Sequence, residues 1–109
     1  MTKRTIAAFA LLAAMTATTQ AHEAPSGWAY PLACCSNRDC TRISVDRVRE
    51  TPDGYAVTLH PGDHDFVTDG PVSYLVPYDS VQDAPDGDYH ICINPQLTLL
   101  CFFAGARGF

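Results

Sequence analysis

From Thr41 onward, hydrophobic residues come in short runs that alternate with polar residues. In the run at 55–60, Tyr55, Val57 and Leu59 occupy every second position, which places them on one face of an extended strand. The preceding run, RISVDRV at 42–48, begins with the same alternation and then breaks. A period of two residues predicts β-strands with one buried face.

Turn signals separate these runs. The sequence TPDG at 51–54 contains Pro52, which presets a turn φ, and Gly54, which accepts a positive one. The runs on either side are therefore predicted to form a hairpin. A polar loop at 60–71 follows, and then a third predicted strand at 72–77.

The C-terminal part of the chain predicts a second hairpin. Its strands lie at 88–94 and 97–105, on either side of Pro95 and Gln96, and the segment 78–87 is interpreted as a turn followed by a loop. Eight prolines spread along the chain oppose a long amphipathic helix. We therefore expect a mostly β fold, a small antiparallel sheet or barrel of about five strands.

Residues 1–21 have the layout of a secretory signal peptide. Lys3 and Arg4 form a charged start, the run 6–15 carries no charge, and small and polar residues follow. A membrane-spanning helix needs ~20 apolar residues, about twice the length of this run. We predict that the signal peptide is removed, that 22–109 forms a single small β domain, and that this domain is periplasmic or secreted.

The charge of the exported part makes some classes of binding partner improbable. Five arginines, no lysine and twelve acidic residues would remain, a net charge of −7 with histidines neutral. Such a chain lacks the basic surface that nucleic acids and anionic membranes attract. The expected partner is an envelope protein or a cell-wall component, with no membrane span after cleavage, and the domain is expected to be a monomer.

The cysteines predict a disulfide framework. Removal of 1–21 leaves 88 residues, and a domain of this size buries only about 60–65% of its unfolded surface, so small exported domains commonly add disulfides. C-x-x-C redox spacing and paired zinc spacing are both missing from the sequence. The five cysteines that we expect to contribute are Cys34, Cys35, Cys40, Cys92 and Cys101.

The sequence leaves the pairing of these cysteines open. We favour Cys92 with Cys101, because they lie on the two arms of the predicted final hairpin. Cys34 or Cys35 then closes on Cys40, or a long-range disulfide ties this N-terminal cluster to the hairpin. One cysteine remains over.

Histidines provide an alternative, metal-binding interpretation. If cleavage leaves His22 as the first residue, its α-amine and imidazole form a chelate for copper(II), which favours nitrogen ligands. The loop residues His60 and His64 and the strand residue His90 are the further candidate ligands for copper or zinc. The leading expectation remains a protein without a cofactor.

Catalytic patterns are missing from the sequence. The serines lie outside any nucleophile elbow, and Asp86 and Asp88 form a turn pair beside Gly87 that nothing marks for acid–base chemistry. We therefore expect a non-enzymatic binding or structural module of the cell envelope. Its candidate aromatic anchors are Trp28, Tyr30, Tyr55, Tyr74 and Tyr78.

Three segments carry a resemblance to known sequences. CCSNRDC at 34–40, the Val76–Pro77 pair, and DGDYHIC at 86–92 followed by CFF at 101–103 resemble a family of small exported proteobacterial proteins with a CCSxxDC segment and an HxC…CFF ending. The resemblance runs from His22 to about Gly105. It implies export and a cysteine framework, and it implies no activity.

Overall fold

A computed structural model of the protein describes residues 23–35 and 38–105. The predicted signal peptide and His22 lie outside these residues. The described chain forms seven short strands and two single-turn 3₁₀ helices. The elements are β1 (Cys40–Ile43), η1 (Val45–Arg47), β2 (Val48–Thr51), β3 (Gly54–Leu59), β4 (Val72–Val76), η2 (Tyr78–Ser80), β5 (Val81–Asp83), β6 (Tyr89–Ile93) and β7 (Leu99–Ala104).

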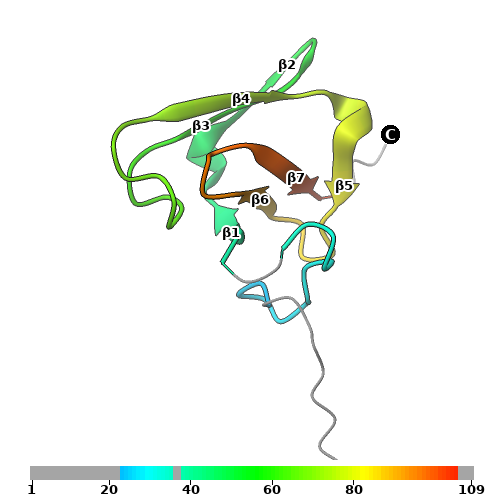
Figure 1. The fold of residues 1–109 in the computed structure, drawn as a ribbon. Coiled ribbons are helices and arrows are strands. Elements are labelled where there is room, and N and C mark those ends of the chain that lie inside the picture. The colour runs from blue at the N-terminus through cyan, green and yellow to red at the C-terminus, as the bar shows by residue number, and fades with distance from the viewer. Residues whose placement is uncertain (1–22, 36–37, 106–109) are drawn as a thin grey trace, which may run out of the picture.

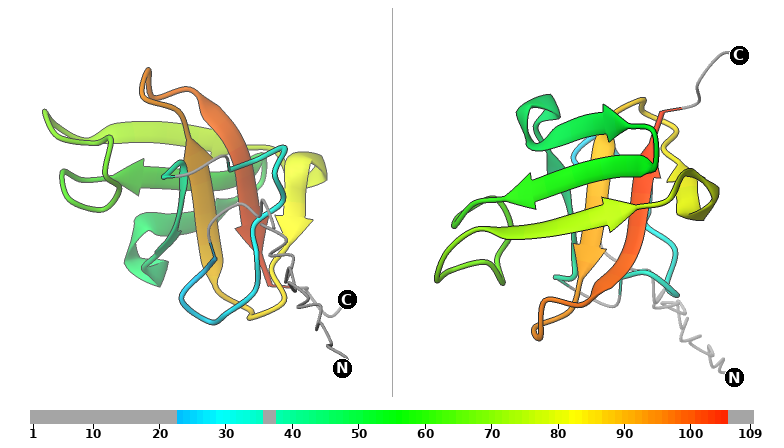
Figure 2. Two further views of the ribbon diagram at one scale, coloured as in Figure 1. Left: turned by 60° about the horizontal axis from the view of Figure 1, so that its bottom comes forward. Right: turned by 90° about the horizontal axis from the view of Figure 1, so that it is seen from above.

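The strands build two packed sheets. One sheet has four strands in the order β1-β6-β7-β5, and the other has three in the order β2-β3-β4. All neighbouring strands are antiparallel except β5 and β7, which are parallel. Figures 1 and 2 show that β2, β3 and β4 run across β6 and β7, as in orthogonal sheet packing. The predicted mostly β fold is confirmed.

The number of strands differs from the expected five for two local reasons. The Ser44 hydroxyl accepts a hydrogen bond from the Asp46 N–H at 3.2 Å, which starts η1 and divides the run 42–48 between two different sheets. In the segment expected to be a turn and loop, Val81–Asp83 forms β5 and pairs with the distant β7. Both predicted hairpins, β2–β3 and β6–β7, are present.

The turn between β2 and β3 requires Gly54. Its φ is +144°, in the region that favours glycine, and a Cβ atom at this position would collide with the Val76 carbonyl of β4. The glycine therefore allows the hairpin to pass close to the next strand.

The main core lies between the two sheets. The alternating β3 residues Tyr55, Val57 and Leu59 are at most 2% exposed, as the sequence pattern predicts. They pack with Ile91 of β6 and Phe102 of β7, among others. Burial of large apolar side chains is the dominant stabilising contribution to such a fold.

A second, smaller core lies on the other face of the four-stranded sheet. Residues 23–35 cover this face, as Figure 1 shows below β1, β6 and β7, and Tyr30 packs there with Cys92 and Phe103. The central strand β6 is consequently buried on both faces. In the part of the chain that the structure describes, no helix is long and apolar enough to cross a membrane.

One disulfide fastens residues 23–35, the N-terminal cover, to the sheet, and a second one joins β1 to β6 within the sheet. Cys34 bonds Cys101, and Cys40 bonds Cys92. The predicted Cys92–Cys101 disulfide is wrong, although these residues do lie opposite each other in β6 and β7. Because β6 is a central strand, Cys92 also lies opposite Cys40 of β1. The disulfide forms with Cys40.

The fifth cysteine, Cys35, is fully buried and belongs to neither disulfide. Long-range bridges to the final hairpin, which the sequence left as one alternative, are therefore the arrangement present in the structure. Disulfides of this kind are typical of proteins that fold in an oxidising compartment. The signal peptide and the periplasmic location stay predictions.

Candidate functional site

A buried hydrogen-bonded chain links the N-terminal cover to β6. His90 is fully buried, and its two ring nitrogens contact the Tyr30 hydroxyl at 2.8 Å and the Asp86 carboxylate at 2.9 Å. A carboxylate only accepts hydrogen bonds, so we assign the proton on the Asp86 side to His90 Nε2. In the neutral ring Nδ1 then accepts the hydrogen bond of the Tyr30 hydroxyl.

Asp86 collects four donors. Besides His90, its carboxylate accepts hydrogen bonds from the Ser26 hydroxyl at 2.7 Å, the Trp28 indole N–H at 3.1 Å and the Asp88 backbone N–H at 3.0 Å. Burial by itself raises the pKa of Asp86, but these hydrogen bonds outweigh it and hold the pKa well below its usual value of 3.8. The carboxylate is therefore ionised at neutral pH.

The Tyr30 hydroxyl keeps its proton. Burial raises the pKa of Tyr30 far above its usual value of 10.0. Negative charge on the nearby Cys35 and Asp86 raises it further. The Trp28 ring packs edge-on against both Tyr30 and His90, with ring centroids 5.0 and 5.1 Å apart. These contacts hold the N-terminal cover on the sheet, and both Tyr30 and His90 are buried.

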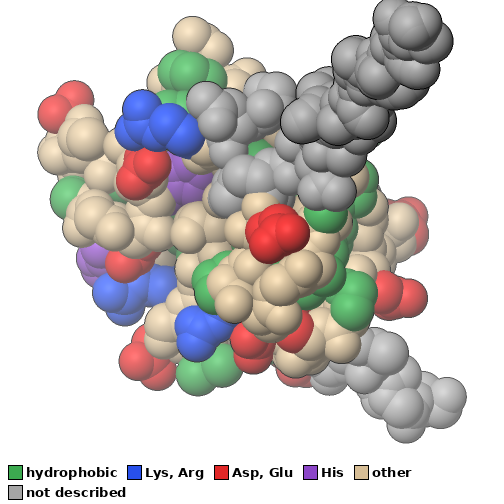
Figure 3. All heavy atoms as spheres, turned by 90° about the horizontal axis from the view of Figure 1, so that it is seen from below, with side chains coloured by type: hydrophobic (Ala, Val, Ile, Leu, Met, Phe, Trp, Pro, Cys, Tyr) green, Lys and Arg blue, Asp and Glu red, His purple; other side chains and the backbone are tan. Residues whose placement is uncertain are grey.

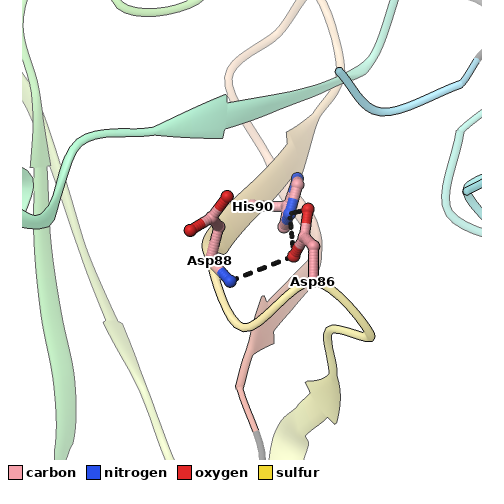
Figure 4. Close-up of side chains that lie close together, drawn as sticks. All are labelled: Asp86, Asp88 and His90. Atoms are coloured by element: carbon pink, nitrogen blue, oxygen red, sulfur yellow. Dashed lines mark hydrogen bonds and ion pairs between the residues drawn. The ribbon is translucent and has the colours of Figure 1, made fainter. Parts of the chain in front are cut away.

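One group of potential metal ligands occurs within the described residues. Asp86, Asp88 and His90 each place one ligand atom within 4.8 Å of the others. Figure 4 shows, however, that the Asp88 carboxylate points away from the His90 ring while Asp86 faces it. An ion would have to displace the hydrogen bonds that Asp86 already accepts, so the arrangement fits a structural role better than a metal site.

Among the described residues, neither His60 nor His64 belongs to a group of three potential metal ligands. His64 is 3% exposed, and its ring contacts the Asp39 carbonyl at 2.6 Å through Nε2 and the Phe66 N–H at 3.1 Å through Nδ1. His60 lies exposed at the start of the same loop. The copper hypothesis therefore depends chiefly on His22, outside the described residues, and stays a prediction.

A groove crosses one end of the two packed sheets. It consists of two adjoining hollows of about 780 and 380 Å³. Both are lined by Glu50 of β2, Tyr55 of β3, and Ala104 and Gly105 at the end of β7. We call the two hollows together the end groove. Concave surfaces of this size are where proteins usually bind ligands.

The two hollows differ in their charged residues. The larger one extends toward Arg42 and Asp88, whose side chains pair at 3.2 Å. The smaller one extends toward Tyr78 and Asp83, and its lining within residues 38–105 includes the carboxylates of Glu50 and Asp83. No sequence pattern singles out Glu50 or Asp83, because their place at the same hollow depends on how the two sheets meet.

Most of the predicted aromatic anchors are part of the cores. Tyr30 and Tyr55 are 2% exposed. Trp28 is half-buried against the second, smaller core. The half-buried Tyr74 donates a hydrogen bond to the Leu97 carbonyl. Tyr78, at 44% exposed, is the member of this set that presents a ring to solvent. It lines the smaller hollow of the end groove.

Elsewhere on the surface, Arg38 and Arg47 pair with acidic side chains. On the face in Figure 3, the blue cationic side chains lie beside red acidic ones. Arg38 pairs with Asp65 at 3.1 Å, and Arg47 pairs with Asp63 at 2.5 Å. Burial by itself raises the pKa of Asp63, but its hydrogen bonds, above all from Arg47, hold the pKa below the usual value.

Comparisons with protein-family models, with curated proteins and with solved structures found no match for this chain.

Proposed function

We propose that the protein is an exported binding module of the cell envelope, without catalytic activity of its own, and that it recognises its partner at the end groove. The observation that carries the proposal is Tyr78, a 44% exposed ring at a concave surface. Its neighbour in the groove is Tyr55, 5.1 Å away in an edge-to-face arrangement. Tyrosines in pockets are frequent anchors of protein interfaces.

Further features of the molecule support this proposal. The two disulfides and the expected signal peptide favour an envelope location. Tyr30 and Asp86, whose pKa values are strongly shifted, belong to the buried chain of hydrogen bonds and do not line the end groove. The groove offers both apolar and polar groups for contact, as a binding surface does.

The experiment compares capture by the purified exported protein and by two single variants. The immobilised protein is incubated with a periplasmic extract of the producing bacterium, and bound proteins are identified by mass spectrometry. We expect Tyr78→Leu to lose the captured partner, because it removes the exposed ring. Asp79→Asn, at an exposed neighbour that does not line the groove, serves as the matched control and should retain it. Capture that is equal for both variants would refute a role of the groove.

A further inference from the structure

The N-terminal cover, residues 23–35, is attached to the four-stranded sheet by its side chains. Within the described residues, the cover contributes no strand to either sheet. Its Trp28 ring packs edge-on against Phe103 of β7, with the ring centroids 5.4 Å apart. The disulfide Cys34–Cys101 adds one covalent bond to such contacts. The cover is therefore a separate layer that is tied to the sheet at one covalent point.

The main core of the domain forms without the cover. Its buried residues run from Ile43 to Ala104, and the half-buried hydrophobic residues that pack against it lie in the same span. The second disulfide, Cys40–Cys92, joins β1 to β6 inside the four-stranded sheet. We call residues 40–105 the body. Because the body has its own core and its own disulfide, the cover can open as a local unit while the body stays folded.

The two disulfides differ in how far a reductant can reach their sulfurs. Cys40 and Cys92 are 2% and 0% exposed. Cys101 is half-buried, and its neighbour Leu100 is exposed, whereas its partner Cys34 is 3% exposed. Thiol–disulfide exchange requires that a thiolate reach one of the two sulfurs. A thiol in solution therefore reaches the Cys34–Cys101 disulfide first, and it attacks at Cys101.

A hydrogen bond favours the same direction of cleavage. Gln82 lies in β5, which pairs with β7, and its side-chain N–H donates to Cys34 Sγ at 3.6 Å. When Cys101 is attacked, negative charge develops on Cys34 Sγ. A hydrogen bond to the charged form stabilises it, and a thiol that ionises more readily leaves faster. Gln82 therefore assists Cys34 as the leaving thiol.

We propose that Cys34–Cys101 is a redox-sensitive lock on the cover, opened by a dithiol reductant while Cys40–Cys92 and the body stay intact. One thiolate of the reductant attacks Cys101 Sγ, the bond to Cys34 breaks, and Cys34 leaves as a thiolate that takes up a proton. The second thiol of the reductant loses its proton and attacks the reductant's sulfur in the mixed disulfide, which releases Cys101 as a thiol. The reductant ends as a disulfide, and two electrons and two protons have passed to the protein.

Opening of the lock exposes the second core. Tyr30, His90 and Phe103 are at most 2% exposed while the cover is closed, and the released cover keeps only its noncovalent contacts with the sheet. Cys35 is fully buried in the same core and belongs to neither disulfide. Its thiol therefore reports, by its reaction with an alkylating reagent, how often the cover opens.

The first test follows the order in which the disulfides open. The exported protein is incubated with dithiothreitol, and samples are alkylated over time and mapped by mass spectrometry. We expect Cys34–Cys101 to open at least about tenfold faster than Cys40–Cys92, with an unchanged far-UV circular dichroism spectrum at that stage. Glutathione, a monothiol, should form its mixed disulfide on Cys101. Opening of both disulfides in one step, or a mixed disulfide on Cys34, would overturn the proposal.

The second test compares wild type with the double variant Cys34→Ser, Cys101→Ser. The two proteins are matched, because in each of them Cys35 is the thiol that remains and Cys40–Cys92 stays in place. We expect Cys35 of the variant to react with a maleimide at least about tenfold faster. The rate should hardly change at low denaturant concentrations, because local opening exposes little surface. Equal rates, or a rate that rises with denaturant as steeply as global unfolding does, would overturn the proposal.

Discussion

Replacement of Asp86 by asparagine tests whether the buried hydrogen bonds hold the N-terminal cover on the sheet. The wild-type carboxylate accepts hydrogen bonds from Ser26, Trp28, His90 and the Asp88 backbone. The asparagine amide nitrogen donates and does not accept, so at least one of these donors loses its partner. An unsatisfied buried donor costs ~1–3 kcal/mol, and the remaining bonds weaken when their acceptor is neutral.

We therefore expect Asp86→Asn to lower the free energy of unfolding by about 3 kcal/mol. For a domain of this size that corresponds to a fall in Tm of ~12–24 °C. Trp28 is the only tryptophan of the chain and donates to Asp86, so its fluorescence reports the unfolding of the cover directly. Asp53→Asn, at an exposed turn position, is the control and should change stability by less than ~0.5 kcal/mol.

The pKa of Asp86 also predicts how the stability of the protein changes with pH. The folded state holds the pKa of Asp86 below 3.8, the usual value. Its ionised form therefore adds stability that is complete above about pH 5 and is lost as the pH falls below about 4. The difference in stability between wild type and Asp86→Asn should shrink in acid. Equal stability at neutral pH, or a difference that is unchanged at about pH 2, refutes the reasoning.

Four further predictions concern the framework of the fold. Gly54→Ala should lower the free energy of unfolding by about 2–4 kcal/mol in denaturant titrations, because the new Cβ collides with the backbone of β4; an unchanged midpoint contradicts this. Non-reducing peptide mapping should join Cys40 to Cys92, whereas a peptide that joins Cys92 to Cys101 refutes the pairing. Replacing Cys40 and Cys92 together by alanine should cost about 4 kcal/mol, since their disulfide closes a loop with a sequence separation of 52. Tyr30→Phe should lose ~1–2 kcal/mol with one hydrogen bond and should lack the wild type's fall in stability as the pH rises above 10.0, the usual pKa of tyrosine. A fall of the same size in Tyr30→Phe assigns it to another group.

The sequence pattern correctly predicted the strand and the turn that depend on neighbouring residues alone. The alternation of Tyr55, Val57 and Leu59 identified β3 and its buried face, and Pro52 with Gly54 identified the turn before it. The same alternation in β6 separates His90 and Cys92 from Ile91 and Ile93. This alternation indicates that His90 lies on the same face of β6 as Cys92, because residues two apart in a strand share a face.

Contacts between distant segments could not be predicted in this way. The short β5 is stabilised by pairing with β7, about twenty residues further along the chain, and Tyr30 meets His90 across a sequence separation of 60. The favoured Cys92–Cys101 pairing failed for the same reason, since the neighbour on the other side of β6 comes from β1. The end groove likewise exists only once Glu50 and Asp83, from different sheets, lie at one end of the domain.

Site-specific photocrosslinking in the cell tests the central claim, that the end groove binds a partner in the envelope, most directly. A photoreactive phenylalanine derivative is placed at Tyr78, in the groove, and in a second strain at Leu75, which is 54% exposed on β4 and does not line the groove. After irradiation, we predict one discrete adduct of higher mass for position 78 and none for position 75. The absence of an adduct at position 78, or the same adduct at both positions, would contradict the account.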